Sequence, residues 1–126
     1  MSLRSVTILA ILCALSVTSL HAEPPPPAKV EIDYLLSYVE TSGCSFYRNG
    51  TWYGGSDAKA HLRTKYEYML ARNLIGSAED FIAKAATKSS MSGKPYRIRC
   101  GTGAEVESGP WLRDVLVRFR ASQRPD

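Results

Sequence analysis

The sequence predicts a small α+β domain in which about four helices pack on a short antiparallel sheet, with one disulfide as a staple. Apolar residues recur at helical spacing in four separate segments. Asn49-Gly50 separates two short runs of aromatic and β-branched residues, which is the strongest short-range signal for a hairpin. Residues 96–100 alternate between apolar or cysteine side chains and arginines, which is the period of a strand.

A predicted export signal precedes this domain. Arg4 lies near the start, residues 6–20 are apolar apart from Ser and Thr, and the small Ala22 follows. These features are typical of a secretory signal peptide over residues 1–22. The apolar run is shorter than the roughly 20 residues that a helix needs to cross a bilayer. We therefore expect export and no stable membrane insertion after cleavage; a retained membrane anchor is the alternative.

The next residues lead into the first helix and the hairpin. Residues 23–29 contain four consecutive prolines and predict a stiff polyproline II spacer. Apolar positions from Val30 to Val39 recur at helical spacing and predict the first helix. Strands over Cys44–Arg48 and Thr51–Tyr53 then flank a type I′ turn, because both turn residues tolerate a positive φ.

Two helices are expected after the hairpin. Ser56 or Asp57 is the predicted N-cap of the second helix, which runs to about Asn73. Ser77 is the predicted N-cap of the third helix, with acidic residues in the first turn that suit the helix dipole. The third helix is expected to end near Lys88.

The C-terminal part adds strands and the last helix. The alternation in Pro95–Cys100 predicts a strand, and residues 104–107 predict a short edge strand. Pro110 suits the first turn of the final helix, where its missing N–H costs nothing. The whole reads as a single domain over residues 30–121, followed by a frayed tail at residues 122–126.

The cysteines indicate an oxidising compartment. Cys44 and Cys100 remain after Cys13 leaves with the signal peptide, and an even pair in an exported protein predicts one disulfide. On the chain-entropy model, a bridge across so long a loop contributes about 4 kcal/mol. Two reduced thiols or a redox-active pair are the alternatives, although no Cys-x-x-Cys spacing favours redox chemistry.

The composition narrows the possible chemistry. Once His21 leaves with the signal peptide, His61 is the one remaining histidine, which is too few ligands for a zinc site. No metal or other cofactor is predicted, because the nucleophile elbow, the P-loop and the dinucleotide fingerprint are all missing. The net charge is +4 and the charges are well mixed, so we expect no nucleic-acid binding. An envelope protein or an anionic glycan is a more suitable partner.

The first group of candidate binding residues lies on the predicted second helix. It comprises His61, Arg63 and Lys65. His61 and Lys65 share one helical face, whereas Arg63 points about 200° away from His61. The alternative is an ordinary amphipathic helix whose histidine forms a hydrogen bond near the core.

The second group lies between the third helix and the following strand. It comprises Ser89, Ser90, Ser92, Lys94 and Tyr96. Hydroxyl groups, a flexible glycine and an ammonium group in so short a segment could bind an anion through backbone N–H groups. The alternative is a helix C-terminus with a Gly stop, in which the serines only fill the loop.

Four short motifs carry a family resemblance: Arg48-Asn49-Gly50, His61-Leu62-Arg63-x-Lys65, Glu79-x-Phe81-Ile82 and Ser89-Ser-x-Ser-Gly-x-Pro-Tyr96. In this order and spacing they resemble the YfeK-like family of uncharacterised bacterial envelope proteins, over roughly residues 30–120. The resemblance implies a periplasmic protein with a signal peptide. It brings no known activity, substrate or catalytic residue.

The residues favour a non-enzymatic binding or accessory module of the cell envelope. No catalytic residue is assigned. One alternative is an inhibitor or immunity protein for a cell-wall-degrading enzyme, since the domain is small, exported and stapled. Another is a small hydrolase of envelope glycan or ester bonds, in which a serine would act with His61.

Overall fold

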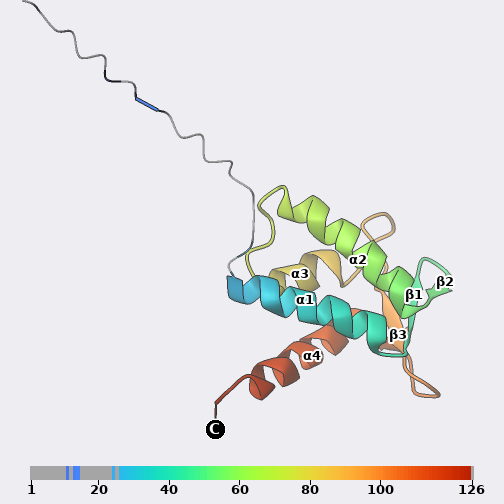
Figure 1. Ribbon diagram of the computed structural model, residues 1–126. Helices are drawn as coiled ribbons and strands as arrows, with labels where there is room; N and C mark the ends of the chain where they lie inside the picture. The colour runs from blue at the N-terminus through green and yellow to red at the C-terminus, as the bar shows by residue number, and fades with distance from the viewer. Residues whose placement is uncertain (1–10, 12, 15–23, 25, 126) are drawn as a thin grey trace, which may run out of the picture.

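The computed structural model describes residues 11, 13, 14, 24 and 26–125. Within these residues the chain forms four helices and one four-stranded sheet, which confirms the α+β fold class (Figure 1). In chain order the elements are α1 (Pro26–Thr41), β1 (Ser45–Arg48), β2 (Thr51–Tyr53), α2 (Gly55–Leu70), α3 (Ala78–Ala85), β3 (Arg97–Arg99), β4 (Val106–Glu107) and α4 (Ser108–Ser122). The predicted signal peptide lies almost wholly outside the described residues.

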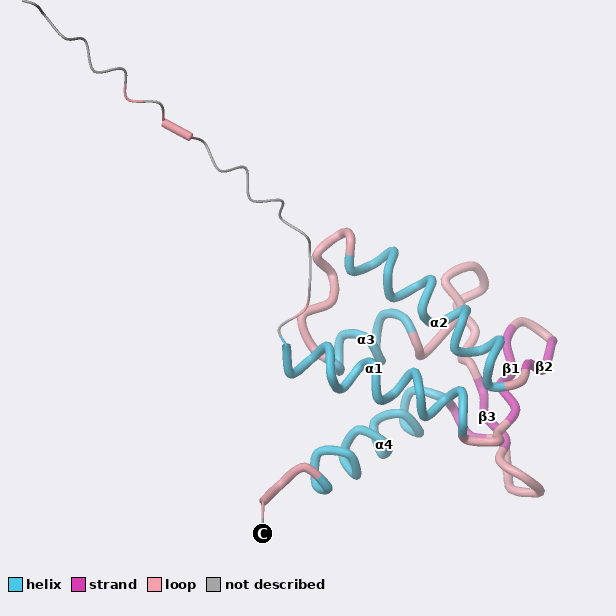
Figure 2. Tube along the Cα trace, viewed as in Figure 1, coloured by secondary structure: helices cyan, strands magenta, loops and turns pink. Residues whose placement is uncertain are grey.

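The sheet is antiparallel throughout, with strand order β2-β1-β3-β4 (Figure 2). Phe46 on β1 lies opposite Ile98 on β3, and this pairing places the hairpin beside the late strand. The turn between β1 and β2 has φ of 48° at Asn49 and 89° at Gly50. Positive φ at both central residues is what a type I′ turn requires, so the predicted hairpin is confirmed.

The predicted disulfide is confirmed. Cys44 lies directly before β1 and Cys100 directly after β3, and their Cα atoms are 4.2 Å apart although 56 residues separate them in the sequence. The bridge therefore joins two neighbouring strands at the same end of the sheet.

The core lies where the four helices meet the sheet. In Figure 1, α1 runs between α2 and α4, with α3 behind it, and contacts join α1 to all three of these helices. The predicted inner face of the first helix is confirmed, since its apolar residues are 0–1% exposed. The largest fully buried side chains are Phe81, Ile32, Leu35, Leu36, Ile82, Ile98, Leu112, Val39 and Val115.

The helix begins earlier than the sequence predicted. α1 starts at Pro26, so Pro27 and residues 28–29 are helical, and the expected extended spacer is wrong from Pro26 onward. Proline fits the first turn of a helix, where its missing N–H has no intrahelical partner and its fixed φ is already helical. Ala28 is 6% exposed, so the extra turn also adds buried surface.

The caps and ends of α2 and α3 also differ from the predictions. Gly54, rather than Ser56 or Asp57, is the N-cap of α2, and no side chain caps this end. This helix ends at Leu70, before a turn in which Asn73 has a φ of 57°. The predicted Ser77 cap is confirmed, because its side chain accepts a hydrogen bond from the Asp80 N–H.

Strand pairing shortens the later elements. α3 ends at Ala85 rather than near Lys88, because Lys88 pairs with Pro95 in an isolated β-bridge. β3 is confined to Arg97–Arg99 and β4 to Val106–Glu107, shorter than the strands predicted there. α4 runs to Ser122, one residue into the predicted tail, and carries Pro110 in its first turn as expected.

Candidate functional site

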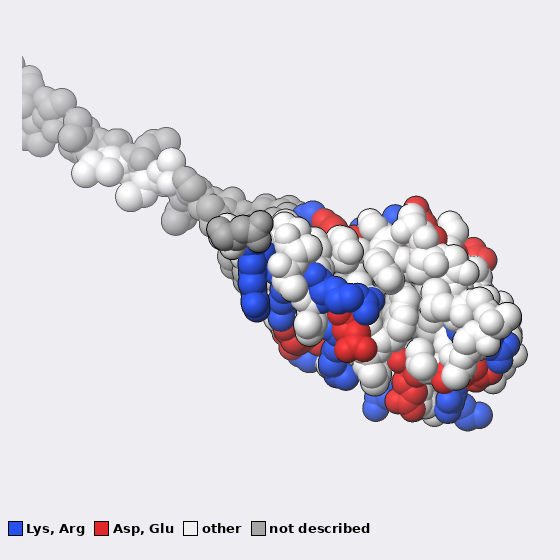
Figure 3. Space-filling view, turned by 90° about the horizontal axis from the view of Figure 1, so that it is seen from below, with Lys and Arg blue, Asp and Glu red and all other residues white. Residues whose placement is uncertain are grey.

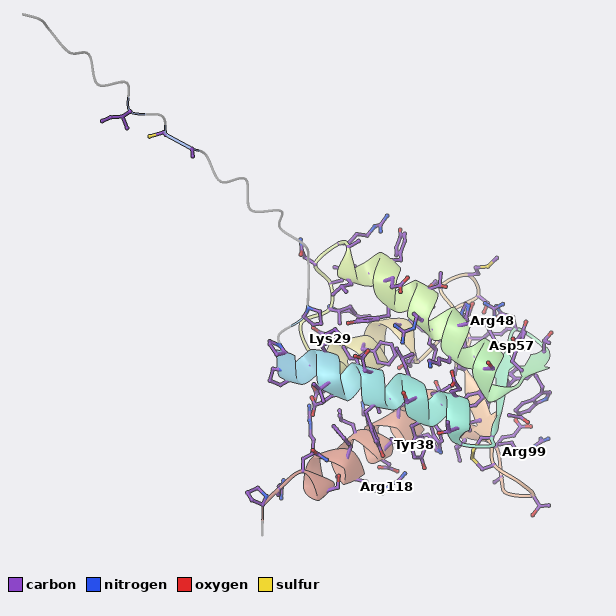
Figure 4. All side chains as sticks on the ribbon, viewed as in Figure 1. Lys29, Tyr38, Arg48, Asp57, Arg99 and Arg118 are labelled. Carbon is purple, nitrogen blue, oxygen red and sulfur yellow. A yellow bond between two sulfur atoms is a disulfide. The ribbon has the colours of Figure 1, made fainter. Side chains whose placement is uncertain are left out.

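A cavity of about 420 Å³ lies between the N-terminal half of α2 and the inner face of the sheet. Most of its wall is apolar, from residues of the core on α1, α2, α4 and the strands: Val39, Phe46, Leu62, Ala86, Ile98 and Leu112. Its polar lining includes the charged or hydrogen-bonded side chains of Arg48, Asp57, His61, Tyr96 and Ser108, together with Tyr47 and Tyr53. Figure 4 shows Arg48 and Asp57 near one another, where the hairpin meets the start of α2.

A close backbone contact fixes α2 beside this cavity. A Cβ atom on Gly55 would lie 2.6 Å from the carbonyl oxygens of Val39 and Glu40, so only glycine allows the start of α2 to approach the end of α1. An ion pair of 2.7 Å between Lys59 and Glu40 spans the same junction. Nothing in the local sequence indicates this helix contact, because it joins two separate helices.

His61 connects three elements at the polar side of the cavity. Its Nδ1 lies 2.9 Å from Nη1 of Arg48 on β1, and its Nε2 lies 3.1 Å from the Tyr96 hydroxyl. Lys65 donates to the same hydroxyl at 3.0 Å and to the Lys88 carbonyl at 2.9 Å. His61, Lys65 and Tyr96, which the sequence assigned to two separate clusters, therefore meet in space. We call Arg48, His61, Lys65 and Tyr96 the cationic cluster.

Arg48 was missing from the predicted binding residues. Besides the contact with His61, its guanidinium lies 5.4 Å from the centre of the Tyr53 ring. The signal that could have found it is its position at the end of a strand, next to the Asn49-Gly50 turn. A side chain there can reach the helix that follows the hairpin, but only the packing of α2 shows that it does.

The loop over residues 89–94, here called the serine loop, uses two of its hydroxyl groups for hydrogen bonds within the protein. Ser89 is 4% exposed, and its hydroxyl accepts hydrogen bonds from the Asn49 side-chain amide at 3.0 Å and from the N–H of Met91 and Ser92. The Ser92 hydroxyl donates to Asn49 Oδ1 at 2.6 Å and accepts from the Lys94 N–H. These hydroxyls tie the loop to the hairpin turn.

The remaining predicted residues are not brought to the cavity. Ser90 and Lys94 are exposed on the serine loop, and Arg63 lies on the side of α2 away from His61. The structure therefore unites two of the three residues of the first predicted group, His61 and Lys65, with one residue of the second, Tyr96. Ser89 stays close through Asn49, which follows Arg48 in the chain.

The cationic cluster has no acidic partner among the residues that the structure describes: none of their ion pairs includes Arg48 or Lys65. Burial, followed by the charges of Arg48 and Lys65, lowers the pKa of His61 below 6.5. Burial, followed by the charge of Arg48, also lowers the pKa of Lys65. Burial raises the pKa of Tyr96. At neutral pH the cluster therefore contains two cations, a neutral imidazole and a neutral phenol.

Hydrogen-bond directions in the cluster follow from the arginine. A guanidinium only donates, and Nη1 of Arg48 lies closer to Nδ1 of His61, at 2.9 Å, than to Nε2, at 3.1 Å, so we assign the lone pair to Nδ1 and the imidazole proton to Nε2. Tyr96 then accepts from both His61 and Lys65. Its own O–H proton has no acceptor among the described residues, and it can donate to a ligand.

The described residues offer little for metal or hydrolytic chemistry. No three His, Cys, Asp or Glu side chains among them lie close enough to hold a metal ion. No hydrogen bond between them joins a serine hydroxyl to His61. Charged side chains on the face drawn in Figure 3 alternate in sign, without the basic stripe typical of nucleic-acid binders.

A protein-family model matches residues 26–120, described as a family of unknown function, DUF5329. The chain belongs to this family. The DUF5329 match covers every strand, and with it all four members of the cationic cluster. It agrees with the resemblance predicted from the four sequence motifs.

A curated relative supports the same assignment within DUF5329. The chain is 40% identical over 62 residues to the uncharacterized protein YfeK of Salmonella typhimurium, over 49% of this chain and 50% of the relative. The chain thus spans about half the length of the curated relative it matches. No solved structure matches the chain. No helix in the described part of the chain is long and apolar enough to cross a membrane.

Proposed function

We propose that this protein is an exported, periplasmic binding module that holds an anionic ligand at the cationic cluster. One observation carries the proposal: within the described residues, the half-buried Arg48 lines the cavity, the half-buried Lys65 contacts it through the Tyr96 hydroxyl, and neither cation forms an ion pair with a carboxylate. Burying charge without a counter-ion is costly, and an anion in the cavity would relieve that cost.

The donors around the cavity suit such a ligand. Arg48 can offer a forked pair of N–H groups, the geometry that best fits a carboxylate or phosphate. The Tyr96 O–H supplies a second donor, and Lys65 adds a positive charge behind it. Titratable groups in a cleft whose pKa values are shifted from their ordinary values are typical of functional sites.

Export is part of the proposal. The N-terminal segment reads as a signal peptide, and a disulfide between Cys44 and Cys100 suits an oxidising compartment. We favour binding over hydrolysis because the Ser89 and Ser92 hydroxyls form hydrogen bonds with Asn49 of the hairpin turn, and none of the described hydrogen bonds joins them to His61.

Thermal unfolding of the protein recovered from the periplasm tests the anion site. Acetate, added at constant ionic strength against chloride, should raise the unfolding midpoint in proportion to its binding. The variants Arg48→Gln and Lys65→Gln should lose this response. Arg63→Gln, a matched charge removal on the opposite side of α2, should keep it. An acetate response that is missing, or equal in all four proteins, contradicts the proposal.

A further inference from the structure

We infer that the ligand is an amphipathic carboxylate, with its head at the cationic cluster and a hydrocarbon tail along the apolar wall of the cavity. This inference rests on the proposed anion site and adds the chemical class of the ligand. It depends on three features of the cavity: its wall, its size and its charge balance.

Most of the wall away from the cluster is apolar, although Tyr47 and Tyr53 also line the cavity. Phe46, Leu62, Ile98 and Leu112 are buried apolar residues that line it, and each comes from a different element. The polar residue among them, Ser108, already donates its hydroxyl to the Ala86 carbonyl. If a small hydrophilic anion were bound, water would fill the rest of the cavity. That water would lie against apolar side chains and would find few hydrogen-bonding partners there.

The size of the cavity exceeds that of a simple anion. At about 30 Å³ for a water-sized group, 420 Å³ holds on the order of ten non-hydrogen atoms. The volume lies in the range of small-molecule sites, which combine a mostly apolar lining with a few polar groups that fix orientation. A head group at Arg48 would account for three or four of those atoms, so the remainder corresponds to a medium-length chain.

The charge balance favours a single negative charge. Arg48 on the cavity wall and Lys65, which lies behind the Tyr96 hydroxyl, contribute two positive charges, and Asp57 on the wall contributes one negative charge. His61 is neutral at pH 7 because its pKa is lowered. A monoanionic carboxylate therefore neutralises the site, whereas a dianionic phosphate monoester would be in excess and would meet Asp57.

Calorimetric titration of the protein recovered from the periplasm, with acetate, octanoate, 1-octanol and octyl phosphate below their micellar concentrations, tests this inference. Each fully buried methylene group tightens binding by up to about fourfold. Because the cavity is partly open, we expect octanoate to bind at least about tenfold more tightly than acetate. We also expect octanoate to bind more tightly than 1-octanol, which has the tail without the charge.

Two leucine variants separate the tail from the head. Ala58 lines the cavity from α2, and Ala58→Leu should occupy the space for the tail, abolishing the advantage of octanoate while leaving acetate binding in place. Ala60→Leu makes the same change at an exposed site on the same helix and should have no effect. Both substitutions keep a good helix former, so both variants should fold.

The outcomes distinguish this inference from the proposed function. If acetate and octanoate bind equally, the hydrocarbon tail is excluded and the anion site stands. If octyl phosphate binds tenfold more tightly than octanoate, the carboxylate class is wrong. If 1-octanol binds as tightly as octanoate, or if neither acid binds, the anion site itself fails.

Discussion

Two regions of this protein contain cationic side chains, and they differ in whether carboxylates pair with those cations. On α4, Arg120 lies 2.5 Å from Glu31 on α1 and 2.5 Å from Glu79 on α3, so two carboxylates surround one guanidinium. In the cationic cluster, Arg48 and Lys65 contact a neutral imidazole and a phenol instead. The Arg120 network joins three helices and is complete. Neither cation of the cationic cluster has a carboxylate partner among the described residues, which is why we propose that this cluster binds an anion.

Loss of the disulfide should have the largest effect, because it joins the strand that carries Arg48 to the strand that follows Tyr96. The double variant Cys44→Ala, Cys100→Ala should be about 4 kcal/mol less stable on the chain-entropy model. Chemical denaturation of this variant and of the wild type measures the difference. An unchanged midpoint would show that the sheet holds the cluster without the bridge.

Gly55→Ala should be the next largest change. Its new Cβ would meet the Val39 and Glu40 carbonyl oxygens at 2.6 Å, so α2 must shift, at a cost of about 1–3 kcal/mol. Anion binding should weaken as well, while the Arg120 network stays intact. Gly54→Ala is the control, since a Cβ there meets nothing within 4 Å. Equal losses in stability from both variants would rule out the close helix contact as the cause.

Removing a positive charge should lower the stability of the protein in the Arg120 network but not in the cationic cluster. Arg120→Met leaves two carboxylates without their partner and should cost about 1 kcal/mol, a modest value because the arginine is 41% exposed. Lys65→Met removes a cation that repels Arg48 and should leave stability unchanged or slightly higher. Urea denaturation of both variants provides the comparison. If the Lys65→Met variant were less stable than the Arg120→Met variant, this difference between the two regions would be wrong.

The pH dependence of stability should be the smallest effect. The cationic cluster and the Arg120 network should lose stability in different pH ranges. The folded protein holds the pKa of His61 below 6.5, so between that lowered value and 6.5 only the unfolded chain binds the proton. This contribution is complete above pH 6.5 and is lost as the pH falls toward the lowered value. His61→Gln should flatten this part of the stability profile.

A second loss should appear at lower pH. The hydrogen bond from Arg120 lowers the pKa of Glu79 below 4.5, so its contribution is present above pH 4.5 and lost below it. Glu79→Gln should remove this lower step and leave the His61 step in place. If His61→Gln and Glu79→Gln changed the stability profile in the same pH range, the two regions would not titrate separately, contrary to this prediction.

The sequence predicted most of the fold because local signals were strong. The Asn49-Gly50 turn, the Ser77 cap and the cysteine pair each have one dominant structural interpretation, and all three are confirmed. Proline is ambiguous in this respect, since it suits both an extended spacer and a first helical turn. The burial of Ala28 against the core favours the helix, and that contact is not visible in the local sequence.

The candidate site was predictable only in part. Helical spacing placed His61 and Lys65 on one face, and both in fact reach the Tyr96 hydroxyl. The sequence did not indicate that the Ser89 and Ser92 side chains form hydrogen bonds with Asn49 in the hairpin turn, because this contact joins segments about 40 residues apart.

By itself, the sequence determined the order of helices and strands, the disulfide and the export signal it predicts, because these depend on spacing and residue type along the chain. Only the tertiary structure decided that Arg48 and Lys65 share a cluster and that Asp57 lies on the same cavity. Whether a charge is paired depends on which elements pack together, and for α2 that is set by backbone contact at Gly55.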